Sequence, residues 1–178
     1  MTSLVFVDTD VLVYARDPRD ATQRSFASEW IRMLWTQERG RTSVQVLGDY
    51  YDLITRRFRP AVSREDAWDD VQHYLSSWNP RALDSEVLDR ARDIEASHHL
   101  GWGECLVVAA AQLQDCVLLL SASLPDRADY GGVIVRSPFT LQIAEESGAY
   151  PLPQRPPSRH RGRGRPRRAP SHDSDAGS

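Results

Sequence analysis

The sequence predicts an α/β domain in which helices cover both faces of a central, mainly parallel β-sheet. Short apolar runs of strand length alternate along the chain with longer segments of helical period, an order typical of crossovers between parallel strands. The first run is apolar throughout, as expected for a strand buried on both faces. We therefore expect a three-layer α/β/α arrangement with right-handed crossovers.

The expected elements follow each other in this alternating order. Strands are predicted near residues 3–7, 81–83, 117–120 and 133–135, with a short one before Ser43. Helices are predicted over residues 10–16, 21–38, 44–58, 64–77, 85–98 and 103–114. Ser43 and Ser63 precede two of these helices in capping positions, and Asn79-Pro80 ends the helix over 64–77.

The chain divides into two parts near Tyr150. With 178 residues, of which 40% are hydrophobic, it can bury one sizeable core, which we assign to residues 1–149. Residues 150–178 are rich in Pro, Arg and Gly and have almost nothing apolar to bury, so we expect a disordered basic tail. The total charge of -3 hides a net charge of +5 in this tail and of -8 in the domain.

The tail contains a short motif with two alternative interpretations. Arg163-Gly164-Arg165-Pro166 is similar to the core of an AT-hook, in which arginines enter the narrow minor groove of A·T-rich DNA. The alternative is a solvated basic tail that contacts DNA or RNA without preference.

Cysteine usage and hydropathy indicate a cytoplasmic protein. Cys105 and Cys116 lie in apolar segments, where free thiols are usually core residues in a reducing compartment. No apolar run is long enough to span a membrane, and the first residues lack a signal-peptide pattern.

Three acids occur at or near the ends of apolar segments. Asp8 ends the first strand, and its side chain either lines a ligand site at the carboxyl edge of the sheet or merely caps the next helix. Asp49 lies inside an apolar helix, and Glu104 lies in the first turn of an almost wholly apolar one. Because neither looks like a residue of a solvated face, we expect all three to converge at one edge of the sheet.

The segments that carry these acids resemble the PIN-domain ribonucleases, most closely bacterial toxins of the VapC type. The resemblance rests on residues 5–14, 42–51 and 100–111, on Leu119-Leu120-Ser121 and on Ser137-Pro138-Phe139. It covers about residues 3–140 and implies a PIN-like three-layer fold. It also implies that Asp8 and Glu104 bind Mg²⁺ (or Mn²⁺) and that Asp49 acts with them in catalysis, through water or as proton acceptor.

The acidic set departs from the family pattern. Asp49 stands where these toxins typically have Glu, and Glu104 where they have Asp, which moves each carboxylate by about 1.5 Å. Ser123 stands at the expected fourth acid, which should lower the affinity for a second ion, and Asp126 is the candidate to substitute partly for it. Asp10 either orients the metal-binding residues without binding the ion itself, or it caps the helix.

The remaining site candidates are arginines. Arg16, Arg56 and Arg57 are candidate phosphate contacts, with stabilisation of helix ends as the alternative. In the tail, Arg163 and Arg165 are the candidate nucleic-acid contacts.

The resemblance implies a Mg²⁺-dependent endoribonuclease, the toxin of a type II toxin-antitoxin pair, with activity reduced by Ser123. Its partners would be an RNA substrate, a small antitoxin protein and a second copy of the chain, with no membrane contact. The alternative is a catalytically inactive PIN-like module that binds RNA or protein.

Overall fold

The computed structural model describes residues 3–141, which form a five-stranded sheet and six helices. The strands are β1 (Leu4–Val7), β2 (Gly40–Arg41), β3 (Cys116–Leu120), β4 (Asp129–Tyr130) and β5 (Val133–Arg136). The helices are α1 (Thr9–Arg16), α2 (Ala21–Thr36), α3 (Val44–Arg56), α4 (Arg64–Ser77), α5 (Ser85–Ser97) and α6 (Trp102–Leu113). The predicted tail, with Arg163 and Arg165, lies outside the described residues.

The sheet is mainly parallel, as the sequence predicts. Its strand order is β2-β1-β3-β5-β4. β1 pairs in parallel with β2 and with β3, and β3 pairs in parallel with β5. Of the described strands, only β4 runs antiparallel to its neighbour.

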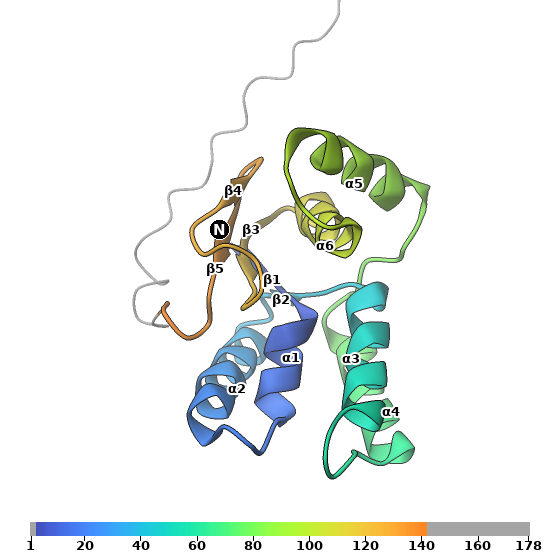
Figure 1. Cartoon of the computed structure of the whole chain (residues 1–178), viewed down its shortest axis with the longest axis vertical. Helices are drawn as coiled ribbons and strands as arrows, with labels where there is room; N and C mark the ends of the chain where they lie inside the picture. The colour runs from blue at the N-terminus through green and yellow to red at the C-terminus, as the bar shows by residue number, and fades with distance from the viewer. Residues whose placement is uncertain (1–2, 142–178) are drawn as a thin grey trace, which may run out of the picture.

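Helices cover both faces of this sheet, which confirms the predicted three-layer arrangement. The chain passes from β1 through α1 and α2 to β2, and then returns across β1 to reach β3 through α6. Because parallel crossovers are right-handed, passages in opposite directions place their helices on opposite faces. Figure 1 shows α1 and α2 on one side of the strands and the pair α5 and α6 on the other, with α3 beside α1.

The strand predicted over residues 81–83 is wrong in length. Only Arg81 pairs, in a single parallel bridge opposite Ser43. The segment lies between Pro80, which has no N–H to donate, and Asp84, which caps α5. These two residues confine any pairing to residues 81–83, of which only Arg81 forms a bridge.

Strand β4 was not predicted from the sequence. Its two residues are too few to show an alternating apolar pattern. The turn that joins it to β5 consists of Gly131 and Gly132, whose φ angles are 62° and 94°. Glycine adopts such angles without a steric cost, which permits the tight antiparallel return.

The buried core brings two strand ends together. Val7 at the end of β1 pairs with Leu120 at the end of β3, and both side chains are fully buried. The residues that follow, Asp8 and Ser121, therefore emerge side by side at the carboxyl edge, where open α/β sheets bind ligands. Within the described residues, no helix has both the length and the apolar character needed to cross a membrane.

Candidate active site

Asp8 is a buried carboxylate at the carboxyl edge of the sheet. Its backbone N–H donates to the Leu120 carbonyl at 3.0 Å, which extends the parallel ladder by one residue. Its Oδ1 accepts a hydrogen bond from the Thr9 N–H at 2.7 Å and so caps α1. Its Oδ2 accepts a hydrogen bond from the Ser121 hydroxyl at 2.9 Å. The same carboxylate therefore caps a helix and lines a pocket of about 320 Å³.

Asp10 lies beside Asp8 and anchors the loop after β3. Its Oδ2 accepts hydrogen bonds from the backbone N–H groups of Ala122 and Ser123, at 2.9 Å and 2.8 Å. Its Oδ1 is buried and has no hydrogen-bond partner within residues 3–141. A buried carboxylate oxygen without a donor is energetically costly, so a proton, a water molecule or a cation is expected to satisfy it.

The two carboxylates disfavour ionisation of each other. Burial, reinforced by the charge of Asp10, raises the pKa of Asp8 to about 7, although hydrogen bonds from Ser121 and Thr9 oppose the rise. Burial also raises the pKa of Asp10. A positive ion placed between the two groups would remove this repulsion.

Asp49 lies on the exposed surface of α3, contrary to the expectation that it avoids solvent. Its charge still contributes to raising the pKa of Asp8, so the two groups are within electrostatic reach. Asp49 does not line the pocket that contains Asp8 and Asp10.

Glu104 lies in the first turn of α6, and its carboxylate is used at the start of its own helix. Because α6 leads back into parallel strand β3, its N-terminus lies at the carboxyl edge of the sheet. Glu104 Oε2 accepts a hydrogen bond from the Gly101 N–H at 2.7 Å. Like Asp49, Glu104 does not line the pocket of Asp8 and Asp10.

The two remaining candidates of the loop after β3 differ in position. Ser123 lines the pocket, and its Oγ lies 3.2 Å from Ser121 Oγ. Asp126 turns instead toward the end of β5, where its Oδ1 accepts hydrogen bonds from the Ser137 N–H at 2.8 Å and from Arg136 Nε at 3.2 Å. Asp126 thus secures the end of β5.

The oxygen donors of the pocket suit a divalent cation such as Mg²⁺ or Mn²⁺. These ions prefer carboxylate oxygens, and Mg²⁺ is commonly held by one or two carboxylates while it keeps several waters. Asp8 and the unpartnered Oδ1 of Asp10 fit such an ion. Residues 3–141 contain no cluster of three or more His, Cys, Asp or Glu suited to a metal, so water or substrate would have to complete the coordination.

The arginines selected from the sequence do not line this pocket. Arg16 Nε donates to Asp70 Oδ2 at 2.9 Å, and Arg56 pairs with Asp52 at 2.8 Å. Arg57 is the exposed C-cap of α3.

Two residues that sequence reasoning did not select, Ser121 and Arg19, belong to the site. Ser121 is fully buried and donates to Asp8, and its place directly after a strand next to β1 was the signal that could have identified it. Arg19 lines the pocket from the loop between α1 and α2. No motif or spacing marks Arg19, because the packing of the surrounding helices determines its position.

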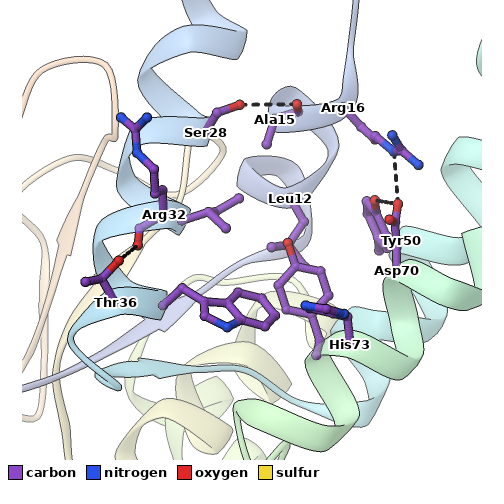
Figure 2. A pocket seen from close by; sticks show the side chains of 12 residues that line it. Leu12, Ala15, Arg16, Ser28, Arg32, Thr36, Tyr50, Asp70 and His73 are labelled. Carbon is purple, nitrogen blue, oxygen red and sulfur yellow. Dashed lines mark hydrogen bonds and ion pairs between the residues drawn. The ribbon is translucent and has the colours of Figure 1, made fainter.

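A second pocket, of about 450 Å³, lies among helices α1, α2, α3 and α4. Figure 2 shows Arg16 of α1, Tyr50 of α3 and Asp70 of α4 together on one side of it, and side chains of α2 on the other. Asp70 Oδ2 accepts hydrogen bonds from Arg16 and from the Tyr50 hydroxyl, at 2.9 Å and 2.8 Å. The remainder is lined by apolar side chains of α1 and α2, by polar side chains of α2, and by His73 and Tyr74 of α4.

The chain belongs to the PIN domain family: the sequence model of this family matches residues 5–122. The match confirms the resemblance drawn from the sequence, and it extends from β1 to the loop after β3. No curated protein sequence matches the chain.

Solved structures of a toxin and of toxin-antitoxin complexes share this fold. A toxin-antitoxin complex from Klebsiella pneumoniae is 17% identical, with a TM-score of 0.57 over 78% of this chain and 100% of that chain. A DNA-bound VapBC complex from Salmonella typhimurium is 12% identical, with a TM-score of 0.56 over 77% and 99%. VapC20 of Mycobacterium tuberculosis, a toxin described as cleaving the sarcin-ricin loop, is 16% identical, with a TM-score of 0.50 over 65% and 86%.

Proposed function

We propose that this protein is a metal-dependent endoribonuclease that hydrolyses RNA phosphodiester bonds and acts as the toxin of a type II toxin-antitoxin pair. The observation that carries the proposal is the pair of buried Asp8 and partly buried Asp10 at the ligand-binding edge of a PIN-family fold. The likeness to toxin-antitoxin complexes and to a toxin that cleaves the sarcin-ricin loop supports it.

The residues of the pocket have distinct roles in this proposal. Bound Mg²⁺ or Mn²⁺ would activate a water molecule and neutralise charge that develops on the phosphate and the leaving oxygen. Asp8 and Asp10 hold the ion, and Ser121 orients Asp8 through its hydrogen bond. Asp49 accepts a proton from the attacking water, either directly or through a second water.

Glu104 is the residue for which resemblance and geometry differ. The resemblance assigns it to the metal, whereas its carboxylate accepts the Gly101 N–H. We propose that Asp10 supplies the second carboxylate and that Glu104 has a supporting role at the start of α6.

The second candidate function is a catalytically inactive PIN-like module that binds RNA or protein. It is favoured by Ser123 at the fourth acidic position and by the absence of a three-acid cluster within residues 3–141. Both candidates predict RNA or protein binding, but only the first predicts cleavage that depends on a divalent ion.

The proposed antitoxin would bind the second pocket. Ile31 and Trp35 offer apolar contacts there, and the Arg16–Asp70 pair offers polar ones. Ile31→Arg should therefore abolish neutralisation by the antitoxin without changing RNA cleavage, because Ile31 is outside the acidic pocket.

The proposed homodimer would use a different apolar surface. Val44 and Leu83 are exposed and close in space, because the Val44 N–H donates to the Arg81 carbonyl at 2.9 Å. Leu88 of α5 is exposed as well. Light scattering of the wild type and of Leu88→Arg tests this assembly, since the charge should yield monomers.

The decisive experiment compares RNA cleavage by the wild type, Asp8→Asn, Ser123→Asp and the control Glu65→Gln, each with Mg²⁺, with Mn²⁺ and with EDTA. Asp8→Asn should slow cleavage by about 100-fold or more, because even indirect metal contacts are worth about 10- to 100-fold. Ser123→Asp should raise the rate several-fold by improving metal occupancy. Glu65 is an exposed acid of α4, and its replacement should have no effect.

Two results would contradict the enzyme proposal. Cleavage that persists in Asp8→Asn or in EDTA would indicate a contaminating nuclease. If the wild type and Ser123→Asp are both inactive while RNA or a partner protein still binds, the binding module is the correct function.

A further inference from the structure

Arg19 presents a fixed guanidinium group at the acidic pocket. Its Nε donates to Asp17 Oδ1 at 2.8 Å and its Nη2 donates to Asp17 Oδ2 at 2.6 Å, a bidentate ion pair. Its guanidinium carbon lies 5.7 Å from the centroid of the Phe58 ring, within the range of a cation–π contact. The side chain is therefore held from two directions.

The two partners of this ion pair differ in exposure. The side chain of Asp17 is 10% exposed, whereas that of Arg19 is 64% exposed. The hydrogen bonds from Arg19 lower the pKa of Asp17, so this carboxylate stays ionised behind the guanidinium. Arg19 Nη1 has no hydrogen-bond partner among the described residues, so its two N–H groups are available to an incoming ligand.

The acidic pocket needs a positively charged group if it is to bind RNA. A phosphodiester that approaches Asp8, Asp10 and Asp49 meets repulsion from their carboxylates before any cation is shared. Of the described residues that line the pocket, Arg19 is the sole cation. A guanidinium group also matches two phosphate oxygens at once, which an ammonium group does not.

We propose that Arg19 binds a backbone phosphate of single-stranded RNA beside the acidic pocket, and that Asp17 is the positioning residue that aims it. The inference rests on the proposed function and identifies its missing phosphate contact. Arg16 and Arg56 are unsuited to this role, because both pair with acids outside the pocket.

Arg56 provides a matched control. Like Arg19 it is an exposed arginine, 77% accessible, and it pairs with a nearby aspartate, Asp52, at 2.8 Å. It differs in lying outside the pocket. Removal of either arginine deletes one exposed positive charge and one ion pair with an aspartate, which is 10% exposed for Asp17 and 48% exposed for Asp52. With folding checked by thermal melting, a difference in RNA binding between the two variants reports the position of Arg19.

The test measures binding of a fluorescent single-stranded RNA in EDTA to Asp8→Asn protein, which keeps the RNA intact. Adding Arg19→Ala should weaken binding by about 3- to 10-fold and reduce the slope of log K against log salt by about 0.7, the value for one phosphate contact on a single strand. Arg19→Lys should keep the slope but lose part of the affinity. Asp17→Asn should also keep the slope with a smaller loss, and Arg56→Ala should change neither quantity.

The outcomes separate this inference from the function on which it rests. If RNA binds and is cleaved but Arg19→Ala behaves like Arg56→Ala, the inference is wrong and the proposed function stands. If the parent protein does not bind RNA at all, the inference is wrong, and the proposed function is wrong as well if the wild type does not cleave RNA with Mg²⁺ or Mn²⁺. Thermal melting within about 2 °C of the parent excludes a folding defect, and in the active protein Arg19→Ala should raise KM more than it lowers kcat.

Discussion

The Ser121 hydroxyl lies between the carboxylates of buried Asp8 and partly buried Asp10. Its Oγ lies 2.9 Å from Asp8 Oδ2 and 3.4 Å from Asp10 Oδ2. A hydroxyl has one hydrogen to donate, and the shorter distance assigns it to Asp8. Asp10 instead relies on the N–H groups of Ala122 and Ser123, so its charge is held by the backbone. The pKa values of both carboxylates are raised, and that of Asp8 lies at about 7.

This property makes stability depend on pH in the absence of divalent ions. The pKa of Asp8 rises from 3.8 to about 7 on folding, so the folded protein binds a proton more tightly than the unfolded chain. The stabilisation is fully present below about pH 4 and is lost as the pH rises toward 7. We expect the free energy of unfolding in EDTA to fall by a few kcal/mol at most between pH 5 and 8.

Urea denaturation at several pH values checks this expectation against Asp8→Asn. The variant keeps the shape of the side chain but cannot ionise, so the fall should be largely absent. Saturating Mg²⁺ should restore wild-type stability at pH 8, because an ion that binds only the folded state stabilises it. Equal pH dependence in both proteins would contradict the raised pKa.

Strand β2 depends on close packing at one glycine. A Cβ atom added at Gly40 would lie 2.5 Å from Cε2 of the Trp78 ring, and Trp78 is almost fully buried. The indole cannot move without disturbing its contacts with Trp35 and Tyr74. The absence of a side chain at Gly40 therefore lets the indole pack directly on the strand.

We expect Gly40→Ala to destabilise the protein by about 1–3 kcal/mol, the usual cost of overpacking a core. Gly48→Ala in α3 is the control, since a Cβ there would meet nothing within 4 Å. It should be neutral or stabilising by about 0.5–1 kcal/mol, because alanine favours a helix. Chemical denaturation of both variants measures the difference, and equal stabilities would show that Trp78 moves aside.

The elements that the sequence predicted correctly are those with a long or wholly apolar pattern. The six helices and strands β1, β3 and β5 have such patterns, and their order determines the parallel sheet. β4 and the bridge at Arg81 involve one or two residues each. Pairings this short depend on contacts with the adjacent strand, so no repeat of apolar residues in the sequence predicts them.

The candidate site was predictable only in part, for the same reason. Asp8 and Ser123 follow strands, so topology alone brings them to one edge. The Glu104 carboxylate accepts the Gly101 N–H instead of lining the pocket, and an acid after an apolar segment is compatible with either position. Arg19 lies in a loop, and its spacing in the sequence from the other site residues does not predict that it lies beside them.

On the scale of the whole molecule, charge is distributed unevenly along the chain. The last 28 residues carry a net charge of +5, and the rest carries -8. An acidic domain is repelled by nucleic acid, whereas an arginine-rich segment is attracted to it with a strong dependence on salt. Affinity for duplex DNA, if present, should therefore reside in the segment after Tyr150.

We expect removal of residues 150–178 to leave the melting temperature unchanged within about 2 °C, because this segment has almost no apolar residues to contribute to a core. The same truncation should abolish salt-sensitive binding to A·T-rich duplex DNA.

If the Arg163-Gly164-Arg165-Pro166 motif acts as an AT-hook, the double variant Arg163→Ala/Arg165→Ala should lose the preference for A·T over G·C duplexes. The matched variant Arg155→Ala/Arg159→Ala removes the same charge and should weaken binding to both duplexes equally, as measured by fluorescence anisotropy at two salt concentrations. Identical behaviour of the two double variants would eliminate the AT-hook and leave a basic tail without sequence preference, and a large loss of stability on truncation would show that the tail is part of the folded domain.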